Sequence, residues 1–389
     1  MKQKNHSIKA FFVKCFGNEK YQAITIPLFA IFISLLAGAV IIGLLGKNPL
    51  SAYQNLLQGS GLLPKPSYAG YKNILTDFTS FLNAWTPMLF ASLAVAVALK
   101  AGLFNIGVSG QMLTAGFFAT ILIGYSDLPA PIAKPLVLIV GMIVGACVGG
   151  LIGFLKYRFN INEVVSSIML NYIAQYVFSF FINTYFVNPV SRQSTSVSEA
   201  SRLTLMDTLV GNLKMDIPLG IILAIITAFF MKFLIDRTKM GYELKAVGAS
   251  PTAAKYAGIH VGKNMVLAMV ISGALAGLAG VTYYLGYFGS IQPKVLVSTG
   301  FDAIAVSLLG NSNPIGIIFS SFLITVISKG STYMSSAAGI QAEIASVITG
   351  ILLLFSACGA YMKYKIKSFQ DDIATEKTIA QKQRKEAEK

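Results

Sequence analysis

The side chains that most often catalyse reactions or bind metal ions are few and scattered in this sequence. The two histidines, His6 and His260, stand far apart, and Cys15, Cys147 and Cys358 show no metal-ligand spacing. A structural zinc site needs about four such ligands, and a disulfide framework needs paired cysteines. The sequence therefore predicts no catalytic residue, no metal site and no disulfide.

The glycines do not form the loop that holds the phosphates of ATP, which is G-x-x-x-x-G-K followed by Ser or Thr. Gly46-Lys47 and Gly262-Lys263 are each followed by asparagine and lack the preceding glycine. If the protein uses ATP, another chain must bind it. The series "GMIVGACVGGLIG" (141–153) has G-x-x-x-G spacing instead, which predicts close packing between membrane helices.

Polar side chains also occur inside apolar stretches. "GLFNIGVS" (102–109) and "GFDAIAVS" (300–307) share a glycine, an isoleucine and a closing Val-Ser, and we expect both to open helices at corresponding places. Transporters are commonly built from repeats whose interrupted helices meet near the membrane midplane and form the substrate path. We predict a path lined by residues of both copies and of the stretch 160–176: Phe104, Asn105, Ser109, Gln111, Asn171, Gln175, Phe301, Asp302 and Ser307.

These polar residues also have a structural interpretation. Asn171 and Gln175 lie one helical turn apart, so they can face the path together or hydrogen-bond to neighbouring helices. Thr299 and Asp302 have the spacing of a capping box, and a carboxylate at a helix N-terminus needs no substrate to explain it. For Asp302 we favour the capping role.

The composition is that of a membrane protein. Of the 389 residues, 54% are hydrophobic and only 12% are charged, whereas an ordinary soluble domain has about 25% charged residues. The mean hydropathy is +0.66. The net charge is +15, but the basic residues gather in the tails and in alternate loops, which is how membrane orientation is encoded. No nucleic acid partner is therefore expected.

Apolar runs of about 20 residues predict helices that cross the membrane. Runs of this length lie near 24–46, 83–100, 103–125, 136–155, 164–187, 217–235, 264–288 and 341–362. Two shorter runs, 298–310 and 314–328, flank the turn "NSNPIG" and predict short or broken helices. The expected fold class is all-α: a polytopic integral membrane protein with about ten membrane segments in two related halves.

Basic residues predict how these segments are oriented. Most of the 31 lysines and arginines fall on the side that carries both termini, and such residues accumulate in the cytoplasm. We predict a cytoplasmic N-terminal segment at 1–23, a transmembrane domain at 24–362 and a charged cytoplasmic tail at 363–389.

The most basic loop between membrane segments, 236–263, contains a short predicted helix. Ser250 is a good N-cap, Pro251 fits the first helical position and Gly258 can close the helix, while Gly248 can end the preceding element. The small side chains of this helix could fit a groove of another protein. It could equally be an ordinary connector, and the spacing does not favour either.

Four stretches resemble the permease subunits of ABC importers, in the superfamily that serves ribose, branched-chain amino acids and nucleosides. The cytoplasmic coupling segment of these permeases is similar to "GYELKAVGASPTAAKYAGI" (241–259). The nucleoside branch is similar to "LKAGLFNIGVSGQMLTAGFFAT" (99–120), "NINEVVSSIMLNYIAQY" (160–176) and "GFDAIAVSLLGNSNPIGI" (300–317). The resemblance implies that the short helix docks into a cleft of an ATPase subunit. The segment it assigns to this coupling contains Glu243, Ala249, Ser250, Pro251, Ala253, Ala254 and Gly258.

The resemblance further implies a nucleoside importer subunit that is not itself an enzyme. The permease domain would be 24–362, this chain would bind no cofactor, and a separate ATPase would use ATP and Mg. The other implied partners are a second homologous permease in a heterodimer, a small-molecule substrate, and an extracellular lipoprotein or periplasmic solute-binding protein. The implied location is the bacterial cytoplasmic membrane, and Phe104 and Phe301 would contact a planar base.

Other solutes and another energy source remain open. Simple sugars or a riboflavin-like solute would suit a similar neutral, polar and aromatic lining. An ion-coupled secondary transporter would need an ionisable group within the membrane. The carboxylates near the predicted bilayer, Glu163, Asp302 and Glu343, are expected to be helix caps, which disfavours this class.

Overall fold

The computed structural model describes residues 13, 19–341, 343–358, 361–362, 364–373 and 375. The regular secondary structure of the described chain is helical apart from an antiparallel hairpin of β1 (Thr204–Val210) and β2 (Leu213–Pro218). The predicted all-α membrane fold is confirmed. The predicted cytoplasmic segments 1–23 and 363–389, which include His6 and Cys15, lie largely outside the described residues.

The chain forms two compact units. The first contains Met1–Pro49 and Ser346–Lys389, and the second contains Leu50–Ala345. In the first unit, α2 (Glu19–Leu44) and most of α14 (Glu343–Ala357) are apolar helices. Ile26 of α2 packs against Ile366, with Phe29 and Met362 beside them.

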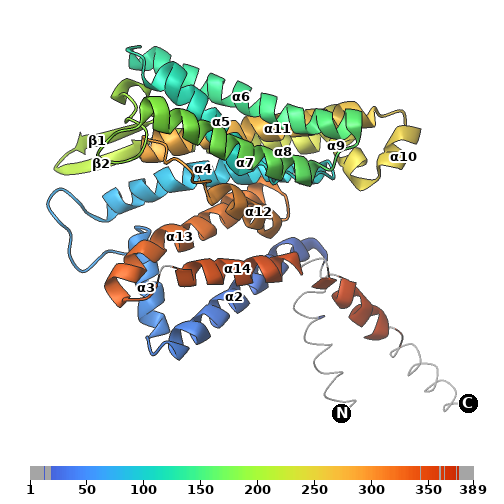
Figure 1. Cartoon of the computed structure of the whole chain (residues 1–389). Coiled ribbons are helices and arrows are strands. Elements are labelled where there is room, and N and C mark those ends of the chain that lie inside the picture. Colours follow the sequence, from blue (N-terminus) through green and yellow to red (C-terminus); the bar gives the residue numbers. More distant parts are fainter. Residues whose placement is uncertain are drawn as a thin grey trace, which may run out of the picture. The chain divides into compact units, whose positions relative to one another are not determined.

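The second unit holds the remaining elements, which Figure 1 shows as a bundle of helices. In chain order the helices are α3 (Pro49–Gly59), α4 (Ile74–Lys100), α5 (Val108–Ala119), η1 (Thr120–Gly124), α6 (Ala130–Phe159), α7 (Glu163–Phe181), η2 (Ile182–Phe186), η3 (Glu199–Ser201), α8 (Gly220–Arg237), α9 (Lys239–Ala249), α10 (Pro251–Tyr256), α11 (Val261–Val281), η4 (Thr282–Phe288), α12 (Thr299–Leu309) and α13 (Pro314–Ala338). The β1–β2 hairpin lies at one end of this bundle, and α9 and α10 lie at the other end (Figure 1).

Several helices have the length and apolar character needed to cross a membrane. Within the described residues these are Thr25–Leu44, Ile74–Lys100, Ala130–Phe159, Glu163–Phe186, Val261–Phe288 and Pro314–Ala338. Shorter apolar helices occupy Val108–Gly124, Thr299–Leu309 and Glu343–Leu352. The protein is therefore a multi-pass membrane protein, and each predicted membrane segment overlaps a helix.

Two predicted segments have the wrong length. The run 314–328, expected to be short or broken, is the first part of the continuous 25-residue helix α13. The apolar run stops at Ser328, but the polar residues that follow still suit a helix. Conversely, the span expected at 103–125 begins only at Val108, because residues 103–106 adopt no regular structure.

Local capping explains where several helices begin. Asn73 accepts from the backbone N–H of Leu75 and Thr76 at 2.8 and 3.2 Å, and Thr76 completes a capping box at the start of α4. Ser250 Oγ accepts from the backbone N–H of Ala253 at 3.3 Å, which starts α10 at Pro251 as predicted. These contacts are made within the chain's own first turn, so local sequence determines them.

Glycines set the distance between the two most closely packed helices. A Cβ added to Gly141 would meet Val281 side-chain atoms, and one added to Gly145 would overlap backbone atoms of Gly273 and Gly277. Added atoms on Gly273 and Gly277 would overlap backbone of α6 in turn. The close packing predicted from the glycine spacing is confirmed, with α11 as the partner of α6.

Candidate functional site

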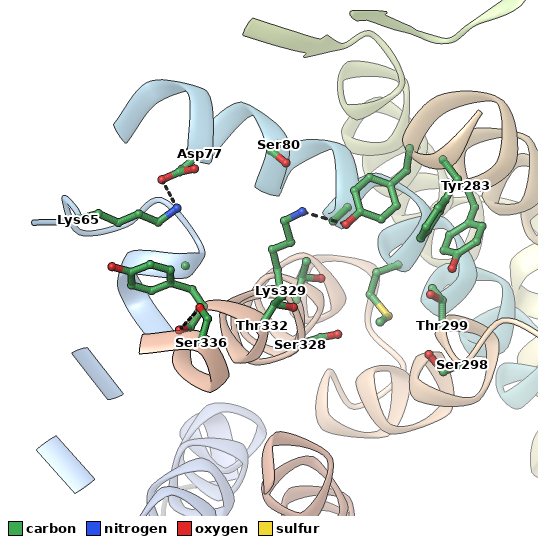
Figure 2. A pocket seen from close by; sticks show the side chains of 17 residues that line it. Lys65, Asp77, Ser80, Tyr283, Ser298, Thr299, Ser328, Lys329, Thr332 and Ser336 are labelled. Atoms are coloured by element: carbon green, nitrogen blue, oxygen red, sulfur yellow. Dashed lines mark hydrogen bonds and ion pairs between the residues drawn. The ribbon is translucent and has the colours of Figure 1, made fainter. Parts of the chain in front are cut away.

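A cavity of ≈ 590 Å³ opens between α4, α13, η4 and the start of α12 in the second unit (Figure 2). Aromatic, hydroxyl and charged side chains predominate in its wall. The lining residues are Gly59, Lys65, Asp77, Ser80, Ala84, Met88, Tyr283, Tyr287, Phe288, Ser298, Thr299, Thr325, Ser328, Lys329, Thr332, Tyr333 and Ser336. The volume is within the range of about 300–1,000 Å³ found for small-molecule sites.

One wall of the cavity is an aromatic cluster on η4. The rings of Tyr283 and Phe288 have centroids 4.9 Å apart, and those of Tyr287 and Phe288 are 4.7 Å apart. This part of the chain is a π-helix, a wider turn that often occurs at functional sites. The rings and phenol hydroxyls of this cluster line the same cavity, which suits a flat solute with polar groups.

Two lysines line the cavity, and they differ in their partners. Lys65 Nζ lies 2.7 Å from Asp77 Oδ2 and 4.8 Å from the ring centroid of Tyr333. Lys329 Nζ donates to Tyr287 Oη at 2.9 Å (Figure 2). Of the carboxylates in the described part of the chain, none forms an ion pair with Lys329. One lysine of the cavity therefore has an ion-pair partner, and the other has none among the described carboxylates.

Hydroxyl groups complete the lining. Ser298 and Thr299 lie at the start of α12, and Thr325, Ser328 and Thr332 follow one side of α13. Hydroxyls can donate and accept hydrogen bonds, so together with the rings and the ammonium of Lys329 they can hold a neutral polar solute. The arrangement therefore suits binding and release.

The predicted path residues lie elsewhere, in a buried polar network at the start of α5. Asn105 Nδ2 donates to Gln111 Oε1 at 3.0 Å and to Ser272 Oγ at 2.8 Å. The backbone N–H of Gly107 donates to Asn105 Oδ1 at 3.0 Å. Asn105, Gln111 and Ser272 are fully buried, so these groups satisfy one another and connect α5 to α11.

Asn171 and Ser109 extend this network. Asn171 Oδ1 accepts from the backbone N–H of Gly110 at 2.9 Å, and its Nδ2 donates to the Ile106 carbonyl at 3.1 Å. Ser109 Oγ donates to the Val297 carbonyl at 2.8 Å. Both side chains are buried, and each forms hydrogen bonds with a neighbouring segment of the chain, which is the structural alternative to a place in the path.

The other predicted path residues are dispersed. Gln175 Nε2 donates to the Lys294 carbonyl at 2.6 Å, and Ser307 is buried within α12. Phe104 is half-buried, and the Phe301 side chain is 42% exposed. None of the nine predicted path residues lines the cavity of Figure 2.

Asp302 does not form the predicted capping box with Thr299. The N-cap of α12 is Ser298, whose carbonyl accepts from the backbone N–H of Asp302 at 2.9 Å, and Thr299 is already the first helical residue. The helix starts one residue earlier than the spacing suggested. Asp302 still lies in the first turn, where a carboxylate interacts favourably with the helix dipole.

The two similar stretches, 102–109 and 300–307, have different conformations. Most of the copy at 102–109 is irregular and precedes α5, whereas the copy at 300–307 lies within α12. Both stretches lie at the start of a helix, α5 and α12, but only the second is helical throughout. They do pack together, because a Cβ added to Gly300 would overlap Ser109.

Sequence reasoning missed the residues that do line the cavity, although two signals were present. Lys329 is a lysine within a helix long enough to span a membrane, and such residues are functional candidates. "YYLGYF" (283–288) concentrates aromatic residues at the end of an apolar run. Neither signal shows that these segments face each other.

A second candidate site is the α9–α10 segment at the other end of the bundle. Ala249, Pro251, Ala253 and Gly258 are exposed there, and Gly258 closes α10 with φ +80°. Sequence reasoning missed the most prominent side chain, Tyr256, which is 95% exposed.

Three expectations for this segment change. Ala254 is only 3% exposed, so it packs inward and cannot line a contact with another protein. Gly248 does not end α9, which continues to Ala249. Glu243 is partly occupied within the chain, because it accepts from Asn264 Nδ2 at 3.0 Å and lies 3.8 Å from Lys239 Nζ.

Ion pairs of Asp236 occur at the junction between α8 and α9. Asp236, beyond the predicted span 217–235, lies 2.6 Å from Lys232 Nζ and 3.5 Å from Lys245 Nζ. The hydrogen bond from Lys232, together with the charge of both lysines, lowers the pKa of the Asp236 carboxyl. Because the pairs are partly exposed, each contributes little to stability.

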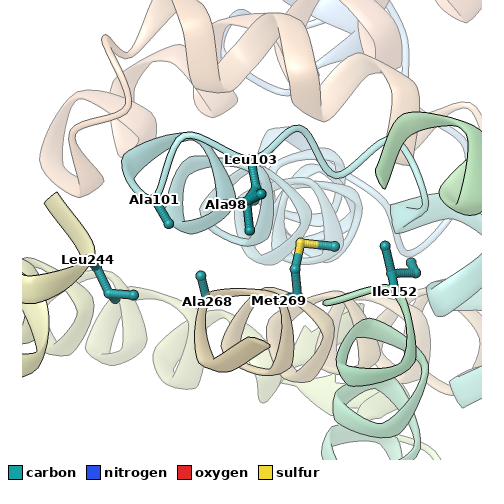
Figure 3. Packing of buried hydrophobic residues seen from close by; sticks show 7 residues of the cluster. All are labelled: Ala98, Ala101, Leu103, Ile152, Leu244, Ala268 and Met269. Carbon is teal, nitrogen blue, oxygen red and sulfur yellow. The ribbon is translucent and has the colours of Figure 1, made fainter. Parts of the chain in front are cut away.

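A buried apolar cluster connects α9 to the polar network. Figure 3 shows Leu244 of α9 in one cluster with residues from the end of α4, from α6 and from α11. The members are Ala98, Ala101, Leu103, Ile152, Leu244, Ala268 and Met269. Leu103 begins the irregular segment that carries Asn105, so the cluster and the network adjoin each other in the chain.

Histidines, cysteines and carboxylates form no candidate metal site in the described part of the chain. No group of at least three His, Cys, Asp or Glu side chains is suitably placed there. Cys147 and Cys358 are free thiols.

Comparison with known proteins identifies similar chains. Residues 78–357 match the family described as branched-chain amino acid transport system / permease component. The nucleoside ABC transporter permease protein NupB of Lactococcus lactis is 34% identical over 87% of this chain and 92% of its own length. The guanosine ABC transporter permease protein NupP of Bacillus subtilis is 34% identical over 87% of this chain and 94% of its own. A glucose ABC transporter permease protein of Haloferax volcanii is 26% identical over 87% of this chain and 88% of its own.

Proposed function

The chain belongs to the family of branched-chain amino acid transport system permease components, and from this premise we propose that it imports nucleosides across a bacterial cytoplasmic membrane. As an ABC permease it is a transport subunit and not an enzyme. Family membership implies an ATPase and a substrate-binding partner. The identity of the solute, the kind of binding protein and the pairing with a second homologous permease are parts of the proposal.

The observation that carries the proposal is the aromatic and hydroxyl-rich cavity. Tyr283, Tyr287 and Phe288 offer rings to a flat base, and stacking of a base on an aromatic ring is worth about 1–3 kcal/mol. The hydroxyl oxygens of Ser298 and Thr325 can accept hydrogen bonds from a sugar ring, while the Thr325 hydroxyl donates to the Ser321 carbonyl at 2.7 Å. The names of two similar permeases, one for nucleosides and one for guanosine, support the same class of solute.

In the proposed path, the cavity is the site that binds the solute during transport. A lipoprotein or periplasmic binding protein delivers the nucleoside from outside, at the end of the bundle that carries the β1–β2 hairpin. The solute rests against η4 and α13, and the permease then opens toward the cytoplasm. The predicted path residues around Asn105 lie deeper, on the cytoplasmic side of this cavity in the proposed orientation.

The proposed coupling element is the surface of α9 and α10, with both termini on the same cytoplasmic side. The ATPase subunit, which binds ATP and Mg in this scheme, contacts exposed residues including Ala249, Pro251, Ala253 and Tyr256. Movement of α9 passes through Leu244 to Leu103 and the Asn105 network. Interfaces of this kind transmit motion because packed elements have few alternative arrangements.

Uptake of radiolabelled guanosine and uridine by cells with and without this chain tests the proposal. We expect uptake to fall in the deletion strain and to return when the gene is supplied again. Uptake of labelled glucose and riboflavin is measured in the same strains. A deletion that reduces sugar or riboflavin uptake and leaves nucleoside uptake unchanged would overturn the nucleoside assignment.

A further inference from the structure

Lys329 is the lysine of the cavity that forms no ion pair with a described carboxylate. Its ammonium group lies beside the ring cluster of η4. We propose that Lys329 determines base specificity: it selects nucleosides whose base presents a carbonyl oxygen over those that present an amino group at the same place. This inference rests on the proposed function, because it assumes that the solute is a nucleoside.

The position of Lys329 supports a role in binding and not in packing. It lies within Pro314–Ala338, a helix long enough to span the membrane, and its side chain lines the cavity while remaining partly accessible. A charge at such a place is costly unless it has a partner or a function. Its partner in the described part of the chain is the neutral hydroxyl of Tyr287, at 2.9 Å.

The other lysine of the cavity provides a contrast within the same site. Lys65 lies 2.7 Å from Asp77, so its charge is balanced by the one carboxylate in the lining. The remaining charge of the cavity is that of Lys329. Lys329 donates to Tyr287 and forms no ion pair with a described carboxylate, so its other N–H groups are available to a hydrogen-bond acceptor on the solute.

Hydrogen-bond chemistry then separates the bases. A lysine ammonium has several N–H donors and no acceptor, and the bond between Lys329 and Tyr287 uses one of them. Guanine and hypoxanthine present a carbonyl oxygen beside a ring nitrogen, and both atoms accept. Adenine presents an amino group in place of this carbonyl, so the amino group and the Lys329 ammonium, both donors, would face each other. Cytosine differs from uracil in the same way, with an amino group in place of a carbonyl.

The rings beside Lys329 place the base where this contact can form. The ammonium lies 4.9 Å from the ring centroid of Tyr287, whose ring is packed against Phe288. Because the ammonium lies over the Tyr287 ring, we expect a base to stack on the neighbouring rings of Tyr283 and Phe288 and to direct its edge toward this ammonium. The ring cluster would therefore bind any base, while the ammonium would distinguish a base edge with a carbonyl oxygen from one with an amino group.

Uptake of two matched pairs of nucleosides tests the inference. Inosine and adenosine differ in a carbonyl or an amino group on the six-membered ring, and uridine and cytidine differ likewise. Initial rates over a range of concentrations are measured for the wild-type transporter and for Lys329→Met, Lys329→Gln and Lys329→Arg. Lys72→Gln is the matched control, because Lys72 is an exposed lysine outside the cavity.

We expect the wild type to prefer inosine over adenosine and uridine over cytidine in kcat/KM. Loss of a good base-edge contact should reduce each ratio about tenfold in Lys329→Met. Lys329→Gln can also accept a hydrogen bond, so it should reduce the ratios by raising kcat/KM for adenosine and cytidine. Lys329→Arg has only donors and should keep the ratios of the wild type. Lys72→Gln should leave rates and ratios unchanged.

Three results would overturn the inference in different ways. If the wild type transports all four nucleosides and the ratios do not change in Lys329→Met, Lys329 does not determine specificity although the proposed function stands. If no nucleoside is transported, the proposed function itself fails. If nucleoside monophosphates compete better than nucleosides, and only while Lys329 is present, the ammonium binds phosphate and not the base.

Discussion

Gly102 and Gly248 pack backbone to backbone where the end of α4 meets α9. A Cβ added to Gly102 would lie 3.0 Å from the Gly248 Cα, and one added to Gly248 would overlap the carbonyl oxygen of Lys100. Gly102 also has φ +71°, which favours glycine. This contact joins the proposed coupling segment directly to the chain that leads into the Asn105 network.

The Gly102–Gly248 contact predicts that Gly248→Ala impairs coupling. The added methyl group has no room, so α9 must move away from α4, and overpacking of this kind costs about 1–3 kcal/mol. We expect normal insertion but reduced nucleoside uptake, measured together with ATPase activity of the assembled transporter. Gly43→Ala is the control, because a Cβ there meets nothing within 4 Å. Wild-type uptake by Gly248→Ala would show that the contact is not needed.

Tyr256 is expected to anchor the ATPase subunit. Its side chain is 95% exposed at the end of α10, and exposed tyrosines are frequent hot spots of interfaces, where truncation costs about 2 kcal/mol or more. Tyr256→Ala should therefore reduce both co-purification of the ATPase and uptake. Tyr364→Ala serves for comparison, since Tyr364 is also an exposed tyrosine, at 69%. Equal recovery of the ATPase with both variants would exclude Tyr256 as an anchor.

Tyr283 is expected to contribute binding through its ring. Tyr283→Leu keeps an apolar side chain but removes the aromatic face, and loss of one stacked ring costs about 1–3 kcal/mol. The KM for every transported nucleoside should rise by a similar factor, because ring stacking does not distinguish the bases. The exposed Tyr185, outside the cavity, provides the control variant Tyr185→Leu. A change confined to one nucleoside would argue against stacking on Tyr283.

Asn105 is expected to stabilise the fold through the buried network. Asn105→Leu leaves Gln111, Ser272 and the Gly107 N–H each without one partner, and an unsatisfied buried group costs about 1–3 kcal/mol. Thermal unfolding of the purified protein in detergent should show a lower Tm. Asn188→Leu removes hydrogen bonds only in an exposed loop, so its Tm should change less. Equal shifts for the two variants would mean that the network adds no stability.

The sequence by itself determined the membrane character, the approximate positions of the membrane helices and the capped helix α10. These features depend on apolar length and on hydrogen bonds between near neighbours in the chain, such as the contact of Ser250 with Ala253. Spacing also predicted the glycine contacts of α6, although it did not identify α11 as the partner helix. The family resemblance rested on the same local stretches, and comparison of the whole chain confirmed it.

Only the tertiary structure decided where the candidate site lies. Lys65, Tyr283 and Lys329 come from three separate parts of the chain, and no periodicity shows that they face one cavity. Asn105 was expected in the path because it is polar within an apolar stretch, but a polar group there can bond either to a solute or to another helix. Its contact with Ser272, distant in the chain, settles its partner. Helix positions follow from local composition, whereas the surroundings of a side chain depend on which helices pack against it.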